Sequence, residues 1–197
     1  MATDAAGLAR CEAAVAAFDA RVDAFFERRL RGRRAADVVM YSASALGEHS
    51  FIWLLVSGVK AWRSGAGWKG LVRLAALLGA ESLLVNGVVK SIFRRRRPEP
   101  AAPRPLPLRA PRSSSFPSGH ASAAFFSAAL LAGSRKSRPF YYALAVAVSA
   151  SRVHVKIHHA SDVVAGAALG AALGAALRGR VPLAPSRPGR RGGARGL

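Results

Sequence analysis

The chain has 197 residues, of which 51% are hydrophobic, and a formal net charge of +20 at pH 7. This length corresponds to one domain, and the single cysteine excludes an internal disulfide. Such a charge could serve a nucleic-acid binder, but the basic residues cluster between long apolar runs instead of along one soluble face. The pattern predicts an integral membrane protein whose loops meet anionic lipid or a phosphorylated substrate, with no nucleic acid as a partner.

The N-terminal segment is typical of an amphipathic helix. Between residues 8 and 30, apolar residues recur at helical spacing and charged residues lie between them. Two interpretations remain open: a helix that lies on the membrane surface, or a helix that packs on its own domain. No cleavable signal peptide is recognisable, because acidic residues interrupt the first apolar stretch. We expect residues 1–37 to comprise this helix and a basic linker.

Five apolar segments predict a membrane domain over residues 38–178. The first two reach the roughly 20 residues that a helix needs to cross the hydrocarbon core. The next two are shorter, and we expect their polar ends to extend them. The last carries glycines every four residues, which permit close helix packing within a membrane. The expected spans are residues 38–59, 70–93, 119–133, 140–151 and 163–177. The predicted fold class is therefore an all-α membrane bundle of about five transmembrane helices plus an N-terminal interfacial helix.

A stretch of different composition separates the second and third apolar segments. Residues 94–117 hold seven of the eleven prolines and seven arginines, which excludes a helix or a lipid-facing strand. Loops of this length in compact domains are functional or disordered, and we expect a catalytic loop. By alternation of the spans, this loop and residues 151–162 emerge on the same face. Residues 179–197, rich in proline, glycine and arginine, are expected to form a disordered basic tail.

Three clusters of polar residues fall on that face. Taken alone, the arginine run at 94–97 could anchor a span, and the PSGH sequence could start a helix with a serine cap. Two histidines four residues apart could pair on a metal, but no glutamate or third ligand lies nearby in the sequence, so we expect no metal site. The clusters are Lys90 with Arg97; Ser118, Gly119 and His120; and Arg152, His158 and Asp162.

Together, the clusters provide what phosphoryl transfer requires: cations around the phosphoryl oxygens, an in-line nucleophile and an acid for the leaving oxygen. Arg97 and Arg152 offer planar donor forks, and Lys90 a point charge. A helix that starts at Ser118 would direct backbone N–H groups at the anion, and Gly119 would let it approach closely.

The remaining three residues complete the hypothesis. A neutral His158 whose other ring nitrogen donates to Asp162 is the expected nucleophile. His120 is then left as the expected general acid.

The patterns K-x6-RP, PSGH and SR-x5-H-x3-D occur unbroken and in this order. They resemble the motifs of the type 2 phosphatidic acid phosphatase family, and the resemblance extends over roughly residues 38–178. It implies a phosphatase that needs no metal and no cofactor, with a phosphohistidine at His158. It also selects His158 over His154 and His159. The chain departs from the family at Lys156, where a small residue is usual, and at Ala160, where proline is common. Most members have six spans, and here the N-terminal helix stands in for the first.

The resemblance further implies a lipid-linked phosphate substrate, most like the polyprenyl-linked substrates of small bacterial members, in the bacterial plasma membrane. Undecaprenyl pyrophosphate, phosphatidylglycerophosphate and phosphatidic acid remain open as substrates. Vanadium haloperoxidases share the constellation but are soluble and larger, and the intact catalytic residues disfavour an inactive scaffold. The distribution of basic residues does not determine sidedness, and family analogy favours an extracytoplasmic site. Nothing in the sequence indicates an oligomeric state.

Overall fold

The computed structural model describes residues 2–64, 68–100, 103–108, 111 and 113–180, and within these ranges it contains helices and loops but no strand. The all-α prediction is therefore confirmed for this part of the chain. The predicted tail lies outside the described residues from position 181 onward. The elements are α1 (Ala2–Arg29), α2 (Arg34–Leu46), the 3-10 turn η1 (Glu48–Ser50), α3 (Phe51–Ser64), α4 (Lys69–Ser82), the π-helical segment η2 (Leu83–Val89), α5 (Lys90–Ile92), α6 (Gly119–Leu131), α7 (Arg138–His154) and α8 (Ala160–Leu177).

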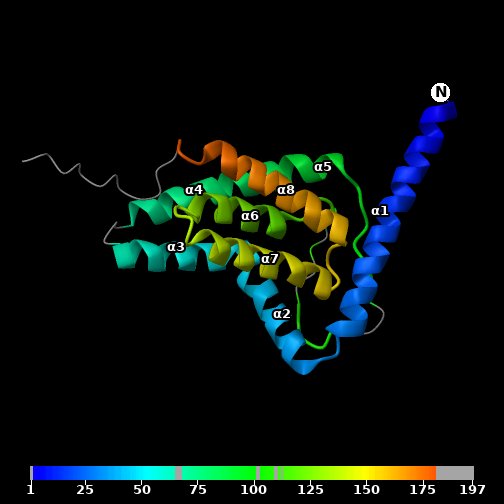
Figure 1. Ribbon diagram of the computed structural model, residues 1–197, viewed down its shortest axis with the longest axis horizontal. Helices are drawn as coiled ribbons and strands as arrows, with labels where there is room; N and C mark the ends of the chain where they lie inside the picture. The colour runs from blue at the N-terminus through cyan, green and yellow to red at the C-terminus, as the bar shows by residue number, and fades with distance from the viewer. Residues whose placement is uncertain (1, 65–67, 101–102, 109–110, 112, 181–197) are drawn as a thin grey trace, which may run out of the picture.

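Helix α6 forms the centre of the bundle. It contacts α3, α4, α7 and α8, and ten of its 13 residues are buried. A helix that is apolar on all sides belongs in a core. Figure 1 shows α3, α4, α6, α7 and α8 running roughly along the long axis of the molecule. The shortness of the third apolar segment is thus explained by its central position between longer helices.

Glycines in α8 allow it to lie directly on α6. A Cβ atom at Gly170 would come within 2.0 Å of the Ser122 carbonyl oxygen, and one at Gly166 within 2.3 Å of the Ser118 carbonyl oxygen. Both distances are far below van der Waals contact, so only glycine fits. The close packing predicted from the four-residue spacing is confirmed. It also joins two of the predicted clusters, since the Ser118 backbone N–H donates to the Asp162 carbonyl at 2.9 Å.

Two helices in the described ranges are long and apolar enough to cross a membrane. They are the continuous helix Lys69–Ile92 with 24 residues and Ala160–Leu177 with 18. Large apolar side chains are exposed along the first, with Leu83 74% and Ile92 71% accessible, as expected of a surface that faces lipid. These two helices correspond to the second and fifth predicted spans.

The first predicted span, residues 38–59, is wrong as a single continuous helix. Helix α2 ends at Leu46, and a turn with positive φ at His49 (49°) and Ser50 (60°) separates it from α3. In Figure 1, α2 points away from the axis of α3. The polar Glu48 and His49 interrupt the apolar run there. Gly47 lets the turn approach α6 and α7, because a Cβ would come within 2.9 Å of Val148 and 3.0 Å of the His120 ring.

Helix α1 begins at Ala2, earlier than predicted, and most of its side chains are exposed. Two residues in its second half are buried, Asp19 and Phe26, and α1 contacts α7 and α8 there. The N-terminal half extends beyond the bundle (Figure 1). Of the two interpretations left open for this helix, packing on its own domain therefore holds for its second half.

Candidate active site

The predicted clusters meet around one cavity of about 450 Å³ at the end of the bundle where α6 begins. Two other predicted residues, Ser118 and Asp162, lie behind its wall and are fully buried. The structure therefore brings all eight predicted residues into one region. Those that line this catalytic cavity are Lys90, Arg97, Gly119, His120, Arg152 and His158.

His158 lies on the short loop between α7 and α8. Its backbone N–H donates to the Arg152 carbonyl at 3.2 Å, and its Nε2 atom lies 3.2 Å from Arg97 Nη1. Its Nδ1 atom lies 3.7 Å from Asp162 Oδ2, which is longer than a hydrogen bond, so the expected donation from this ring nitrogen to Asp162 is not formed in the structure. Burial lowers the pKa of His158 to about 3, although Asp162 opposes the shift. The imidazole is therefore neutral at ordinary pH, the state that a histidine nucleophile requires.

Asp162 is held in place by donors other than His158. Its Oδ2 atom accepts from Ser115 Oγ at 2.5 Å and from the His159 backbone N–H at 2.8 Å. Its Oδ1 atom accepts from Arg95 Nη1 at 2.6 Å. With its lone pairs engaged on both oxygens, this fully buried carboxylate is fixed behind the His158 ring.

Arg95 extends this network to the N-terminal helix. Its Nη2 atom donates to Asp19 Oδ2 at 2.7 Å, and Asp19 also accepts from the backbone N–H and the hydroxyl of Ser161, each at 2.7 Å. Burial opposes ionisation of Arg95, but its contacts with Asp19 and Asp162 outweigh burial and raise its pKa. Helix α1 thus reaches the Asp162 carboxylate through a single guanidinium.

Arg152 presents unsatisfied donors. Its side chain is fully buried, and Nη1 donates to Ser44 Oγ on α2. Its Nε and Nη2 atoms are buried without a hydrogen-bond partner among the described residues. Buried donors of this kind are rare in folded proteins, and Arg152 lines the catalytic cavity. An oxyanion in that cavity would satisfy them.

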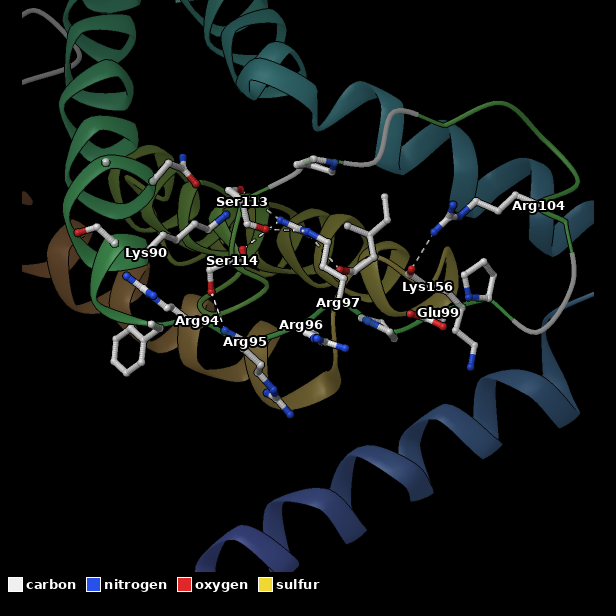
Figure 2. Close-up of a pocket in the computed structure, with 18 residues that line it drawn as sticks. Lys90, Arg94, Arg95, Arg96, Arg97, Glu99, Arg104, Ser113, Ser114 and Lys156 are labelled. Atoms are coloured by element: carbon white, nitrogen blue, oxygen red, sulfur yellow. Dashed lines mark hydrogen bonds between the residues drawn. The ribbon is translucent and has the colours of Figure 1, made fainter.

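Two further cations complete the lining. The guanidinium of Arg97 donates to the carbonyls of Ile157 at 3.0 Å, Ser114 at 3.1 Å and Ser113 at 3.2 Å, which fixes its orientation. Lys90 is buried, and Figure 2 shows its ammonium directed towards Ser113 and Arg97. Carbonyl contacts leave the positive charge of Arg97 uncompensated, so it remains available to an anion.

The start of α6 faces the same cavity. Ser118 Oγ accepts from the Ala121 backbone N–H at 3.4 Å, so the predicted N-cap is confirmed. A Cβ at Gly119 would come within 2.5 Å of Asn86 Oδ1, so a larger residue there would require the Asn86 side chain to move. His120 follows, and its Nε2 atom lies 3.5 Å from Glu48 Oε2 in η1. Each cavity histidine thus has a carboxylate beside it.

The neighbouring ionisable residues have structural partners. His154 Nε2 lies 2.8 Å from Asp37 Oδ1 in a buried pair, and His159 is the N-cap of α8. Lys156 Nζ donates to Asp23 Oδ2 at 2.5 Å. The charge that Lys156 adds to the family pattern is therefore met by an acid on α1.

Sequence reasoning assigned no role to several residues of the site. Glu48 was detectable as an acid inside an apolar segment. Asp19 is one of several acids on α1, and Arg95 is one of four consecutive arginines, so local sequence does not distinguish them. The residues without a predicted role are Asp19, Ser44, Glu48, Arg95 and Ser115.

The sequence profile of the PAP2 superfamily matches residues 70–182. The chain therefore belongs to this superfamily, and it is a membrane phosphatase, an enzyme that hydrolyses phosphoric esters. The family predicted from the three sequence motifs is confirmed.

Two kinds of relative support this placement. Decaprenylphosphoryl-5-phosphoribose phosphatase of Mycobacterium tuberculosis, in strains CDC 1551 and H37Rv, is 33% identical over 160 residues, covering 73% of this chain and 87% of the relative. The crystal structure of a transmembrane PAP2-type phosphatidylglycerolphosphate phosphatase from Bacillus subtilis superposes with a TM-score of 0.59 at 26% identity, covering 80% of this chain and 82% of that one.

Proposed function

We propose that the protein hydrolyses a lipid-linked phosphate monoester or pyrophosphate without a metal ion, through a phosphohistidine at His158. The observation that carries the proposal is the catalytic cavity, where a neutral His158 and a second histidine lie among three cations. Those cations, Lys90, Arg97 and Arg152, supply the positive charge that a metal ion provides in other phosphatases.

The proposed reaction has two steps. His158 Nε2 attacks phosphorus, the bond to the leaving oxygen breaks, and His120 gives that oxygen a proton. Water then attacks the phosphohistidine, with His120 taking its proton. The P–N bond breaks, inorganic phosphate leaves, and His158 returns to its neutral form. In this mechanism the His158 ring moves closer to Asp162, which lies 3.7 Å from Nδ1 in the structure, and Asp162 then orients the imidazole in both steps. The start of α6 at Ser118 and Gly119 contributes backbone donors to the phosphoryl oxygens.

The substrate we favour is decaprenylphosphoryl-5-phosphoribose, as in cell-wall arabinan synthesis. The support is the 33% identity to the phosphatase named for it, over 87% of that relative. Phosphatidylglycerophosphate is the first alternative, because the structural neighbour carries that name. Undecaprenyl pyrophosphate and phosphatidic acid are the others.

We place the protein in a bacterial plasma membrane with the catalytic cavity on the extracytoplasmic side. In this proposal residues 38–178 form the phosphatase domain with five spans, the first of them broken at the turn 47–50. Residues 94–117 form its catalytic loop, and α1 lies at the membrane surface. The exposed apolar side chains of Leu8, Val15 and Phe18 on α1 support an interfacial position.

The test is phosphate release by the purified protein from a panel of these four lipids, with and without EDTA. We expect the polyprenyl phosphoribose to give the highest kcat/KM and EDTA to leave it unchanged. Reversible loss of activity in EDTA would contradict the metal-free mechanism. Release from none of the lipids would contradict the proposed function.

A further inference from the structure

A second cavity adjoins the catalytic one. This outer cavity has a volume of about 830 Å³ and lies along the start of the proline- and arginine-rich loop (Figure 2). It shares Lys90, Arg97, Asn86 and Ser113 with the catalytic cavity. Because these residues line both spaces, one extended ligand can occupy both at once.

The lining of the outer cavity is strongly basic. It includes seven basic side chains and one acidic side chain, Glu99. Such an excess of positive charge in a concave surface attracts anions. The basic residues are Lys90, Arg94, Arg95, Arg96, Arg97, Arg104 and Lys156.

Most of these basic side chains are engaged by the protein itself. Arg95 and Lys156 pair with acids, as described above, and Arg97 is held by loop carbonyls. Arg104 donates to the carbonyls of Val155 at 3.1 Å and Lys156 at 3.0 Å. These four residues shape the wall of the cavity.

Arg94 and Arg96 differ from their neighbours. The loop is extended after Phe93, so successive side chains point in opposite directions. Arg95 and Arg97 turn inward and are partly buried, whereas Arg94 and Arg96 turn outward and are exposed. Neither of the outward pair forms a hydrogen bond or ion pair with a residue that the structure describes. Two guanidinium groups at the cavity edge are therefore available to a ligand.

The outer cavity also lies at the end of a lipid-facing helix. Leu83, Val88 and Ile92 are exposed along the helix that ends there, and Phe93 lines the cavity itself. A lipid tail packed on these side chains would bring its head group to Arg94 and Arg96 first. The distal end of that head group would reach the catalytic cavity.

We propose that the outer cavity binds a second phosphate of the substrate, the phosphodiester that joins its polyol head group to its tail, through Arg94 and Arg96. The preferred substrates are then lipids with two phosphates separated by a polyol. This inference rests on the proposed function, whose favoured substrate carries a phosphoryl link to the prenyl chain in addition to its 5-phosphate. Bilayer lipid head groups are the other anions that Arg94 and Arg96 can bind, because arginines at the end of a span also anchor that span in the membrane.

The test compares two lipids with the same acyl chains in neutral detergent micelles. Phosphatidylglycerophosphate carries a phosphodiester in addition to its monoester, and phosphatidic acid carries the monoester alone. For the double variant Arg94→Gln and Arg96→Gln, we expect the ratio of kcat/KM between the first lipid and the second to fall about tenfold, mainly through KM. An unchanged ratio would overturn the inference. If both lipids lose activity equally, the ratio is also unchanged, and this is the result expected of a membrane anchor.

The matched control is Arg135→Gln with Lys136→Gln, which removes the same charge from the exposed loop between α6 and α7. This loop follows the C-terminal end of α6, away from His120. We expect the control to leave the ratio unchanged. A fall as large as in the Arg94 and Arg96 variant would attribute the effect to net charge and overturn the inference.

Binding separates this inference from the proposed function. Failure of the wild-type protein to hydrolyse any of the four lipids named above would contradict the proposed function alone. The subsite is then judged by equilibrium binding of the two lipids to the His158→Ala protein. Adding Arg94→Gln and Arg96→Gln must weaken binding of phosphatidylglycerophosphate more than that of phosphatidic acid, and equal weakening would overturn the subsite.

Discussion

Arg95 Nη1 lies 2.6 Å from Asp162 Oδ1 and holds the carboxylate behind the proposed nucleophile. The other terminal nitrogen of the same guanidinium, Nη2, donates to Asp19 Oδ2 on α1 at 2.7 Å. Asp19 lies outside residues 70–182, which the family profile matches. Part of the support for the catalytic residues therefore comes from the N-terminal helix, outside the segment that the family profile matches.

Replacing Asp19 tests that support. Asp19→Asn keeps the shape of the side chain but removes the charge that holds Arg95, which lets the Asp162 carboxylate shift. We expect kcat to fall about 10- to 100-fold with little change in KM, because small displacements of catalytic groups cost rate more than binding. Glu12→Gln, the same charge change at an exposed position on α1, is the control and should retain full activity. Equal kcat for the two variants would show that α1 has no positioning role.

The three neighbouring histidines should behave differently. His158→Ala should abolish phosphate release and phosphoenzyme formation while the protein remains folded in detergent. His159→Ala should retain substantial activity, because the residue caps helix α8 and does not line the catalytic cavity. His154→Ala leaves Asp37 buried without its partner and should lower stability by about 3–5 kcal/mol, whereas His154→Gln should keep both fold and turnover. Turnover by His158→Ala would disprove the nucleophile assignment.

Glu48 should matter only where an acid is needed. Its carboxylate lies 3.5 Å from His120 Nε2 and favours the protonated ring that donates to the leaving oxygen. We expect Glu48→Gln to lower kcat on an alkyl phosphate lipid about tenfold to 100-fold. On p-nitrophenyl phosphate, whose leaving group needs no proton, the loss should be much smaller. An equal loss on both substrates would exclude a role for Glu48 through the general acid.

The buried His158 makes stability depend on pH. In the folded state, burial lowers its pKa to about 3, whereas in an unfolded chain a histidine binds a proton below about pH 6.5. The folded state is therefore favoured above pH 6.5 by this group, and that contribution is lost as pH falls from about 6.5 towards 3. We expect the Tm of wild-type protein to fall more between about pH 7 and pH 4.5 than that of His158→Gln. Parallel Tm profiles would contradict this account.

The contact between α6 and α8 should be intolerant of added volume. At Gly170 a new Cβ would lie 2.0 Å from the Ser122 carbonyl oxygen, so Gly170→Ala must separate the two helices. We expect a loss of about 1–3 kcal/mol, measured as a lower Tm in detergent. Gly79→Ala on α4 is the matched control, because a Cβ there meets nothing within 4 Å, and better helix propensity should stabilise it by up to about 1 kcal/mol. Equal Tm changes would contradict the packing argument.

Local sequence was sufficient for much of the fold. The helix start at Ser118, the extended loop after Phe93 and the close packing of α8 all follow from caps, prolines and glycine spacing, which act over a few residues. His158 and Asp162 lie four residues apart across a helix N-terminus, so their proximity was also visible in the sequence. The exception is the turn at 47–50. There Glu48 and His49 interrupt the apolar pattern only briefly, but the backbone turns at His49 and Ser50, and Gly47 packs closely against α6 and α7.

Tertiary structure decided which polar residues serve the site. Arg95 and Arg96 are adjacent residues of the same type, yet only Arg95 turns inward. It donates to Asp19, 76 residues earlier in the chain. His154 pairs with Asp37, 117 residues away, and so stays out of the catalytic cavity. The apolar segments of the sequence predicted a helical membrane domain, and its three motifs, through their resemblance to a known family, predicted a phosphatase. Contacts between distant segments decided which arginine holds Asp162 and which arginines stay exposed, because local patterns carry no information about such distant partners.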